Sequence, residues 1–124
     1  MKIGRDGSDV DNAGGGGNVD CAIDITTGEL HNVVEFNSWN DVRKITHHPD
    51  SNTLLEGVRI EGWNEIVKMV NDYQARLPQL KTIGWDIAIG ENGPIIIEGN
   101  DNWEISLVQI CSHGLQQEFD NYFN

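Results

Sequence analysis

The sequence predicts an α+β fold in which two main helices pack on an antiparallel sheet. Apolar runs of strand length stand in consecutive pairs along the chain, and a short turn signal joins each pair, as in β-hairpins. Two other segments, 64–77 and 101–122, repeat apolar residues with helical spacing. Strands joined by short turns run antiparallel, and a helix buries its apolar stripe against a neighbouring layer. The 124 residues are enough for one domain.

The first part of the chain consists of strands and loops. Residues 1–5 can form an edge strand, and residues 6–17 are predicted to be a glycine-rich loop that ends in four consecutive glycines. Apolar residues recur with a period near two over 19–25, and a partner strand is predicted over 30–36 after the turn at 26–28.

The second part of the chain holds the helices. Residues 37–62 are polar and irregular, and a short strand can form at 55–60. The clearest helix follows at 64–77, and a last helix is predicted after Asp101, which can cap it with Glu104 as the reciprocal partner. The two apolar stripes comprise Ile66, Met69, Val70, Tyr73 and Leu77, and then Val108, Cys111, Leu115, Phe119 and Tyr122. Gly114 weakens the middle of the last helix.

Residues 84–100 are predicted to form a β-hairpin with two carboxylates opposed on one face. Trp85, Ile87 and Ile89 alternate with Asp86 and Ala88, and on the return strand Ile96, Glu98 and Asn100 share a face. If the loop is Glu91-Asn92-Gly93, Asp86 lies directly opposite Glu98. Like charges opposed across strands are destabilising unless a cation lies between them. This pattern therefore predicts an oxygen-lined site for a divalent metal.

The same residues allow a second register. A two-residue turn at Asn92-Gly93 would pair Asp86 with Gly99 and send Glu98 to the other face. Both carboxylates would then be ordinary solvated strand residues, and the pattern alone leaves the two alternatives open. In the first register, the helix predicted after Asn100 would add a positive dipole end and unpaired N–H groups beside the carboxylates, which favours a phosphate there.

Composition and charge argue against several classes of function. The net charge of −12 argues against binding to nucleic acid or to an anionic membrane surface. No run approaches the roughly 18 apolar residues of a membrane span, and the first residues lack the apolar core of a signal peptide. Cys21 and Cys111 are expected to be buried free thiols of a cytosolic protein.

A collinear set of motifs covers the chain from about Arg5 to Tyr122. It comprises Arg5, Val10-Asp11-Asn12 and the glycine run, Ile23-Asp24, Thr27-Gly28-Glu29-Leu30, Thr46-His47-His48-Pro49-Asp50, Glu56-Gly57, residues 83–89 and residues 97–101. This set resembles the sugar-transfer-associated ATP-grasp group, which is related to glutamate ligases. The fold implied is the second subdomain of an ATP-grasp enzyme.

The resemblance implies a chemistry, its cofactors and its residues. ATP would phosphorylate a small-molecule carboxylate, and an amine would displace the phosphate. By position, Asp86 and Glu98 would hold one Mg²⁺ or Mn²⁺, and Glu98 would bridge to a second ion that Asn100 also contacts. Asn12 and the glycines after it, Gly15 and Gly16 among them, correspond to a substrate or phosphate loop. Arg5 is a candidate contact of the same loop, and the alternative is a solvated charge at the end of a strand.

Departures from the family pattern limit what this chain is expected to do alone. The adenine-contacting linker and the phosphate-binding lysines have no counterpart in residues 1–124, and Gly84 stands where relatives often carry a basic residue. The chain is therefore expected to be the C-terminal, metal-binding half of a larger cytoplasmic ligase, inactive by itself, with a homodimer covering exposed apolar surface. The family label suggests surface-polysaccharide or cell-envelope synthesis. The alternative is a non-catalytic binding module that retains the fold.

Other candidate sites are weaker. Adjacent His47 and His48 point opposite ways on an extended chain, and no third ligand at zinc spacing accompanies them. Cys111 with His113 could form a thiol nucleophile, but Cys111 lies on an apolar stripe, so core packing is favoured. No Gly-Lys-Ser/Thr follows the glycine run, as a P-loop requires. Trp39 and Trp103 stay open as walls of a sugar site.

Overall fold

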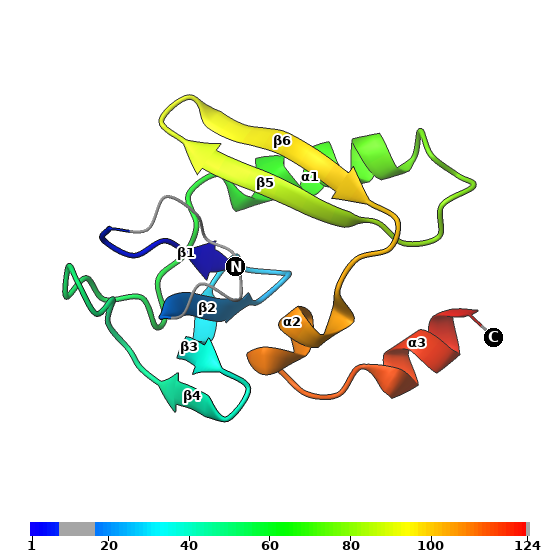
Figure 1. Ribbon diagram of the computed structural model, residues 1–124. Coiled ribbons are helices and arrows are strands. Elements are labelled where there is room, and N and C mark those ends of the chain that lie inside the picture. Colours follow the sequence, from blue (N-terminus) through cyan, green and yellow to red (C-terminus); the bar gives the residue numbers. More distant parts are fainter. Residues whose placement is uncertain (8–16, 124) are drawn as a thin grey trace. The chain divides into compact units, whose positions relative to one another are not determined.

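The computed structural model describes residues 1–7 and 17–123, which form two compact units. Unit 1 comprises Met1–Arg59 and Ile105–Asn124, and unit 2 comprises Ile60–Glu104 (Figure 1). The chain therefore leaves unit 1 after Arg59, just before its midpoint, and returns to it at Ile105, after the hairpin. The architecture is α+β with antiparallel sheets, as predicted.

Four antiparallel strands form the sheet of unit 1 in the order β1-β2-β3-β4 (Figure 1). Strand β1 spans Lys2–Ile3, β2 spans Asn18–Ile23, β3 spans Leu30–Ser38 and β4 spans Asp41–Lys44. The first three lie where alternation predicts them, with shifted ends. Strand β4 lies in the segment that was expected to be irregular. Alternation did not predict it, because its four residues include a single apolar side chain, that of Val42.

The short strand expected at 55–60 does not form. An isolated bridge joins Glu29 to Arg59, and only a few hydrogen bonds, such as that from Leu30 N–H to the Val58 carbonyl at 2.8 Å, accompany it. The Glu56 carboxylate accepts the backbone N–H groups of Asn32 at 3.2 Å and Val33 at 3.1 Å. Asn32 has a φ of 51°, which breaks the regular course of β3 at this point. The carboxylate thus satisfies backbone donors of β3 that a neighbouring strand would otherwise pair.

The core of unit 1 takes its side chains from β2, from β3, from the segment after β4 and from the segment that returns after unit 2. Its apolar side chains are at most 9% exposed, and they are Val19, Cys21, Leu30, Val33, Val34, Phe36, Leu55 and Cys111. Both cysteines are free and buried, as expected from the sequence. Of the side chains described in the returning segment, that of Cys111 is buried in this core.

The single last helix expected from the sequence is two helices. Helix α2 spans Ile105–Ile110 and α3 spans Gln116–Phe123. Between them, the Gln109 side-chain oxygen accepts the N–H of Leu115 at 2.9 Å, so a side chain replaces the helical carbonyl acceptor near Gly114. The predicted single stripe is therefore wrong, and two of its members, Val108 and Tyr122, are 50% and 63% exposed.

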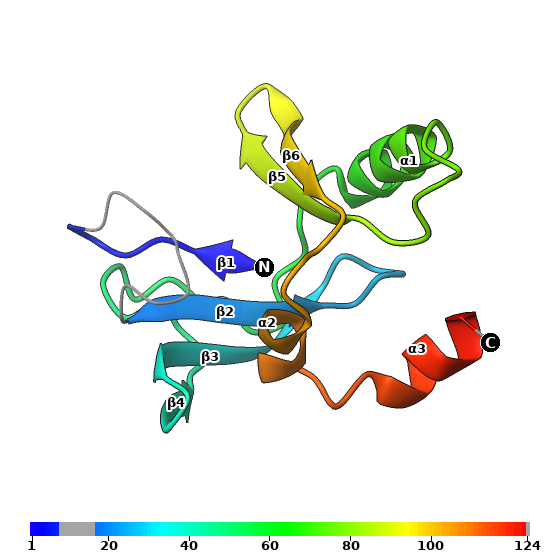
Figure 2. The ribbon, with the colours of Figure 1, turned by 45° about the vertical axis from the view of Figure 1, so that its right-hand side comes forward.

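Unit 2 consists of helix α1, Trp63–Gln74, and a β-hairpin that lies alongside it in both views (Figures 1 and 2). Ile66 is 4% exposed, and the ring of Tyr73 meets that of Trp85 edge-on at 6.2 Å. The helix ends before the predicted Leu77, because Arg76 donates to the Tyr73 carbonyl in a tighter turn that precedes Pro78. In the described part of the chain, no helix has the length and apolarity to cross a membrane.

Candidate functional site

The hairpin of unit 2 has a two-residue loop. Strand β5 spans Gly84–Gly90 and β6 spans Gly93–Asn100, and Gly90 pairs with Gly93. Glu91 and Asn92 are therefore the whole loop, and Gly93, with a φ of 96°, adopts the left-handed conformation that favours glycine. The predicted loop Glu91-Asn92-Gly93 is wrong, and so is the alternative turn at Asn92-Gly93.

A one-residue bulge in β6 nevertheless places Asp86 directly opposite Glu98. From the loop, the ladder runs regularly as far as the pair Ile87–Ile96, and the next pair is Asp86–Glu98. Ile97 is the extra residue between them, as in a β-bulge. The predicted opposition of the two carboxylates is thus present, and the bulge rather than the loop length produces it.

The bulge also sorts the side chains of β6 between the two faces. Ile96 pairs with Ile87 on the face of Trp85, so it does not share a face with Glu98 and Asn100 as the alternation predicted. On this covered face, a Cβ added at Gly99 would lie 2.8 Å from the Trp85 ring. Asp86, Glu98 and Asn100 are exposed on the other face.

The exposed face presents oxygen donors of the type that magnesium prefers. The Asn100 amide nitrogen donates to Glu98 Oε1 at 3.0 Å, which holds the two side chains together beside Asp86. Mg²⁺ is usually bound by one or two carboxylates and completes its shell with water and phosphate oxygens, so this donor set fits it. Among the described residues, no group of three or more His, Cys, Asp or Glu side chains could hold a metal ion.

The helix predicted to begin directly after Asn100 does not begin there. Helix α2 begins at Ile105, after a turn over residues 101–104, and it belongs to unit 1. Asp101 is therefore too far from the first helical residue to cap it, and the capping box with Glu104 is wrong. The expected phosphate site at a helix N-terminus directly after Asn100 is therefore wrong, because residues 101–104 form no helix.

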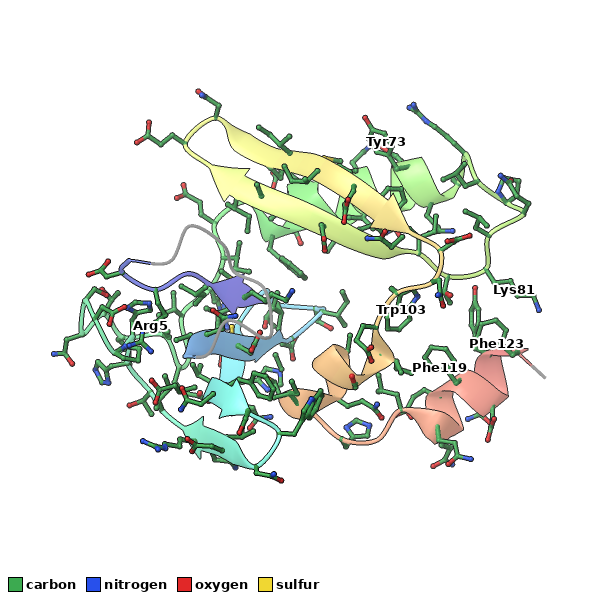
Figure 3. The ribbon with its side chains drawn as sticks, in the orientation of Figure 1. Arg5, Tyr73, Lys81, Trp103, Phe119 and Phe123 are labelled. Atoms are coloured by element: carbon green, nitrogen blue, oxygen red, sulfur yellow. The ribbon has the colours of Figure 1, made fainter. Side chains whose placement is uncertain are left out.

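Arg5 joins three segments of unit 1 through its guanidinium (Figure 3). Its Nε and Nη2 bind the two oxygens of Asp50 at 2.7 and 2.9 Å. Its Nη1 binds both Glu35 Oε1 and the Gly17 carbonyl oxygen at 2.8 Å. The Arg5 side chain is 23% exposed. These four bonds tie the segment that follows β1 to strand β3, to the loop around Asp50 and to the residue that precedes β2.

The pairing of opposite charges shifts the pKa values of Asp50 and Arg5. The Arg5 hydrogen bonds, followed by one from the Asp6 backbone N–H at 2.9 Å, lower the pKa of Asp50 to about 2. In turn, the hydrogen bonds to Asp50 and Glu35 raise the pKa of Arg5. Glu35 and Asp50 could not be assigned as its partners from the sequence, because they lie 30 and 45 residues away.

The lowered pKa of Asp50 makes a testable contribution to acid stability. A carboxyl group whose pKa is depressed in the folded state stabilises the fold above its unfolded pKa, about 4, and loses that effect as the pH falls toward 2. Asp50→Asn should therefore lower the unfolding midpoint at pH 6, and its difference from the parent should shrink between about pH 4 and 2. Urea unfolding at stepped pH measures this. A difference that stays constant down to pH 2 would contradict it.

His48 is part of the same loop and does not form a zinc site with His47. It is 8% exposed, and its Nδ1 accepts the Ser51 backbone N–H at 3.3 Å. Its Nε2 therefore carries the proton and donates to the Gly4 carbonyl at 2.9 Å. Both ring nitrogens are engaged, and the histidine holds the loop against the residue that follows β1.

The remaining predicted residues of the substrate loop, Asn12, Gly15 and Gly16, lie outside the described residues. Gly17, which ends the glycine run, is described and has a φ of 77°. A role for Arg5, Asn12, Gly15 and Gly16 toward substrate or phosphate stays a prediction. What the structure adds is that Arg5 binds the Gly17 carbonyl directly after these glycines.

Cys111 is a core residue, as its place on an apolar stripe indicates. It is 6% exposed, and burial raises the pKa of its thiol to about 11. A buried thiol with a raised pKa carries little thiolate at neutral pH, which favours packing over a role as a nucleophile. His113 instead binds Glu118 Oε1 at 2.8 Å.

Comparison with known proteins gives one match. A family model described as sugar-transfer associated ATP-grasp matches residues 1–122. Neither the curated proteins nor the solved structures contain a match to this sequence.

Proposed function

This chain belongs to the sugar-transfer associated ATP-grasp family, and from that membership we propose that it carries the metal- and phosphate-binding half of an ATP-dependent carboxylate–amine ligase. Family membership supports an ATP-using, ligase-like activity in general. The observation that supports the finer assignment is the direct opposition of Asp86 and Glu98 across the hairpin, with Asn100 bonded to Glu98.

In this proposal, the chain's own residues create a place for a divalent cation. Two carboxylates opposed across strands repel each other, and a cation between them relieves that repulsion. Asp86 and Glu98 would bind Mg²⁺ or Mn²⁺ through oxygen, and Asn100 would hold Glu98 in position and contact a second ion. Magnesium, when bound, neutralises charge on the phosphates of ATP. The exposure of all three side chains leaves room for water and phosphate oxygens.

The substrate part of the proposal involves Arg5, Asn12, Gly15 and Gly16. Backbone N–H groups of a glycine run can bind an anion, and Arg5 would keep the end of that run in place through the Gly17 carbonyl. The substrates would be ATP, a small-molecule acid and an amine, in the cytoplasm, where ATP is supplied. Surface-polysaccharide or cell-envelope synthesis fits the family description. Turnover would require basic residues beyond those of residues 1–124, and a homodimer stays a prediction.

Titration of the 124-residue chain tests this function. Calorimetry with Mn²⁺, with Mg²⁺-ATP and with ATP in the presence of a chelator should give weak binding of the metal, and of ATP only when metal is present. The chain alone should form no ATP-dependent product from acids and amines. Failure to bind Mn²⁺, or binding of ATP that does not depend on metal, would contradict the proposal. Metal binding without any nucleotide binding would favour the non-catalytic module.

A further inference from the structure

A tryptophan packs at the end of the row formed by Asp86, Glu98 and Asn100. Gly84 pairs with Asn100 and stands two residues before Asp86. A side chain at position 84 would therefore point to the face that carries these donors. A Cβ added at Gly84 would lie 2.5 Å from the Cβ of Trp103 and 2.9 Å from its Cγ. Trp103 therefore occupies the side-chain position of residue 84 on the donor face. Figure 3 shows Trp103 on the segment that leaves β6.

The position of Trp103 is fixed by contacts within unit 2. Its indole N–H donates to Thr82 Oγ1 at 3.4 Å, and its side chain is half-buried. The short Cβ contact involves atoms attached directly to two backbones, so neither can yield by rotating a flexible side chain. Only glycine fits at position 84 while Trp103 holds this place.

We propose that Trp103 is a positioning residue that selects the metal bound by Asp86 and Glu98. This inference rests on the proposed function. The indole offers no oxygen ligand and lies at one end of the donor row, so it would restrict the ligands that a bound ion could take from that side. Mg²⁺ needs about six ligands in compact octahedral geometry, whereas Ca²⁺ takes about six to eight at longer distances. Closing one side therefore favours Mg²⁺ and Mn²⁺ over Ca²⁺.

Competition between metals measures this selectivity. Free Mn²⁺ is followed by electron paramagnetic resonance while Mg²⁺ or Ca²⁺ is added to the full chain. Trp103→Ala should lower the ratio of Mn²⁺ to Ca²⁺ affinity by about tenfold. Replacing a group that supports metal ligands changes metal affinity by about 10- to 100-fold, and we expect the lower end of that range. Trp103→Phe keeps an aromatic wall and should retain the ratio. Trp39→Ala is the matched control, because Trp39 is 62% exposed in unit 1 and distant in sequence from the donors.

A second variant covers the case in which Trp103→Ala does not fold. Trp103→Leu keeps the Cβ and Cγ that pack on Gly84 but removes the flat ring, and it should also lower the ratio. One result overturns the inference and leaves the proposed function standing. In that result the parent chain binds Mn²⁺ and Asp86→Asn weakens the binding, but both Trp103 variants keep the parental ratio. If the parent chain does not bind Mn²⁺, both the inference and the proposed function are overturned.

Discussion

Replacing Asp86 by Asn is expected to lower the affinity for Mn²⁺ at least about tenfold and to raise the unfolding midpoint of the metal-free chain. The two effects share one cause. Asp86 lies directly opposite Glu98, so its charge both attracts the cation and repels the neighbouring carboxylate. Asparagine has almost the same shape and lacks this charge. Metal titration and thermal unfolding in chelator measure the two effects on the same samples.

Glu91→Gln is the matched control for this variant. Glu91 is an exposed carboxylate in the loop of the same hairpin, and the loop residues Glu91 and Asn92 have no partner in the β5–β6 ladder. Its removal changes the net charge by the same amount and should leave the Mn²⁺ affinity within about twofold of the parent, because exposed charges are screened by salt. If Asp86→Asn and Glu91→Gln weaken metal binding equally, the effect comes from overall charge and the site is not between Asp86 and Glu98.

Arg5→Ala is expected to lower the unfolding midpoint by about 5–10 °C. The substitution removes four hydrogen bonds, three of them to carboxylates, and leaves Glu35 and Asp50 without the cation they share. Arg5→Lys should recover only part of this loss, because an ammonium group cannot bind both oxygens of Asp50 in the fork geometry of a guanidinium. Scanning calorimetry at neutral pH provides the measurement.

Arg43→Ala provides the comparison for Arg5. Arg43 also binds both oxygens of one carboxylate, at 2.9 and 3.1 Å, but its partner Asp41 is two residues away and the Arg43 side chain is 64% exposed. An exposed local pair contributes little, so the midpoint should change by less than about 2 °C. Equal losses for Arg5→Ala and Arg43→Ala would show that Arg5 does not hold distant segments of unit 1 together.

The hairpin shows what alternation can and cannot predict. The alternation identified two strands, a turn near Asn92 and the opposition of Asp86 and Glu98. It gave the wrong loop, because an inserted residue such as Ile97 has the same effect on register as a longer loop. The bulge also placed Ile96 on the covered face. Nothing in the residue types of this strand marks where a bulge occurs.

Longer-range features depended on contacts that the sequence does not display. Helical spacing predicted α1, with its end three residues too late, but it joined α2 and α3 into one helix, although Gly114 indicated a weak point there. The partners of Arg5 and the packing of Trp103 on Gly84 involve residues far apart in the chain. The family, in contrast, was predictable, because the collinear motifs extend over nearly the whole chain, and the match over residues 1–122 confirms it.

The most direct test of the metal site is an anomalous difference map from crystals of this chain grown with Mn²⁺. The site described above requires a peak between the carboxylates of Asp86 and Glu98, close to Asn100, and the same peak should be lost in Asp86→Asn. A map in which Mn²⁺ binds only elsewhere, for example at Asp41 or Asp50, or in which no peak lies between Asp86 and Glu98 at saturating Mn²⁺, would contradict the account.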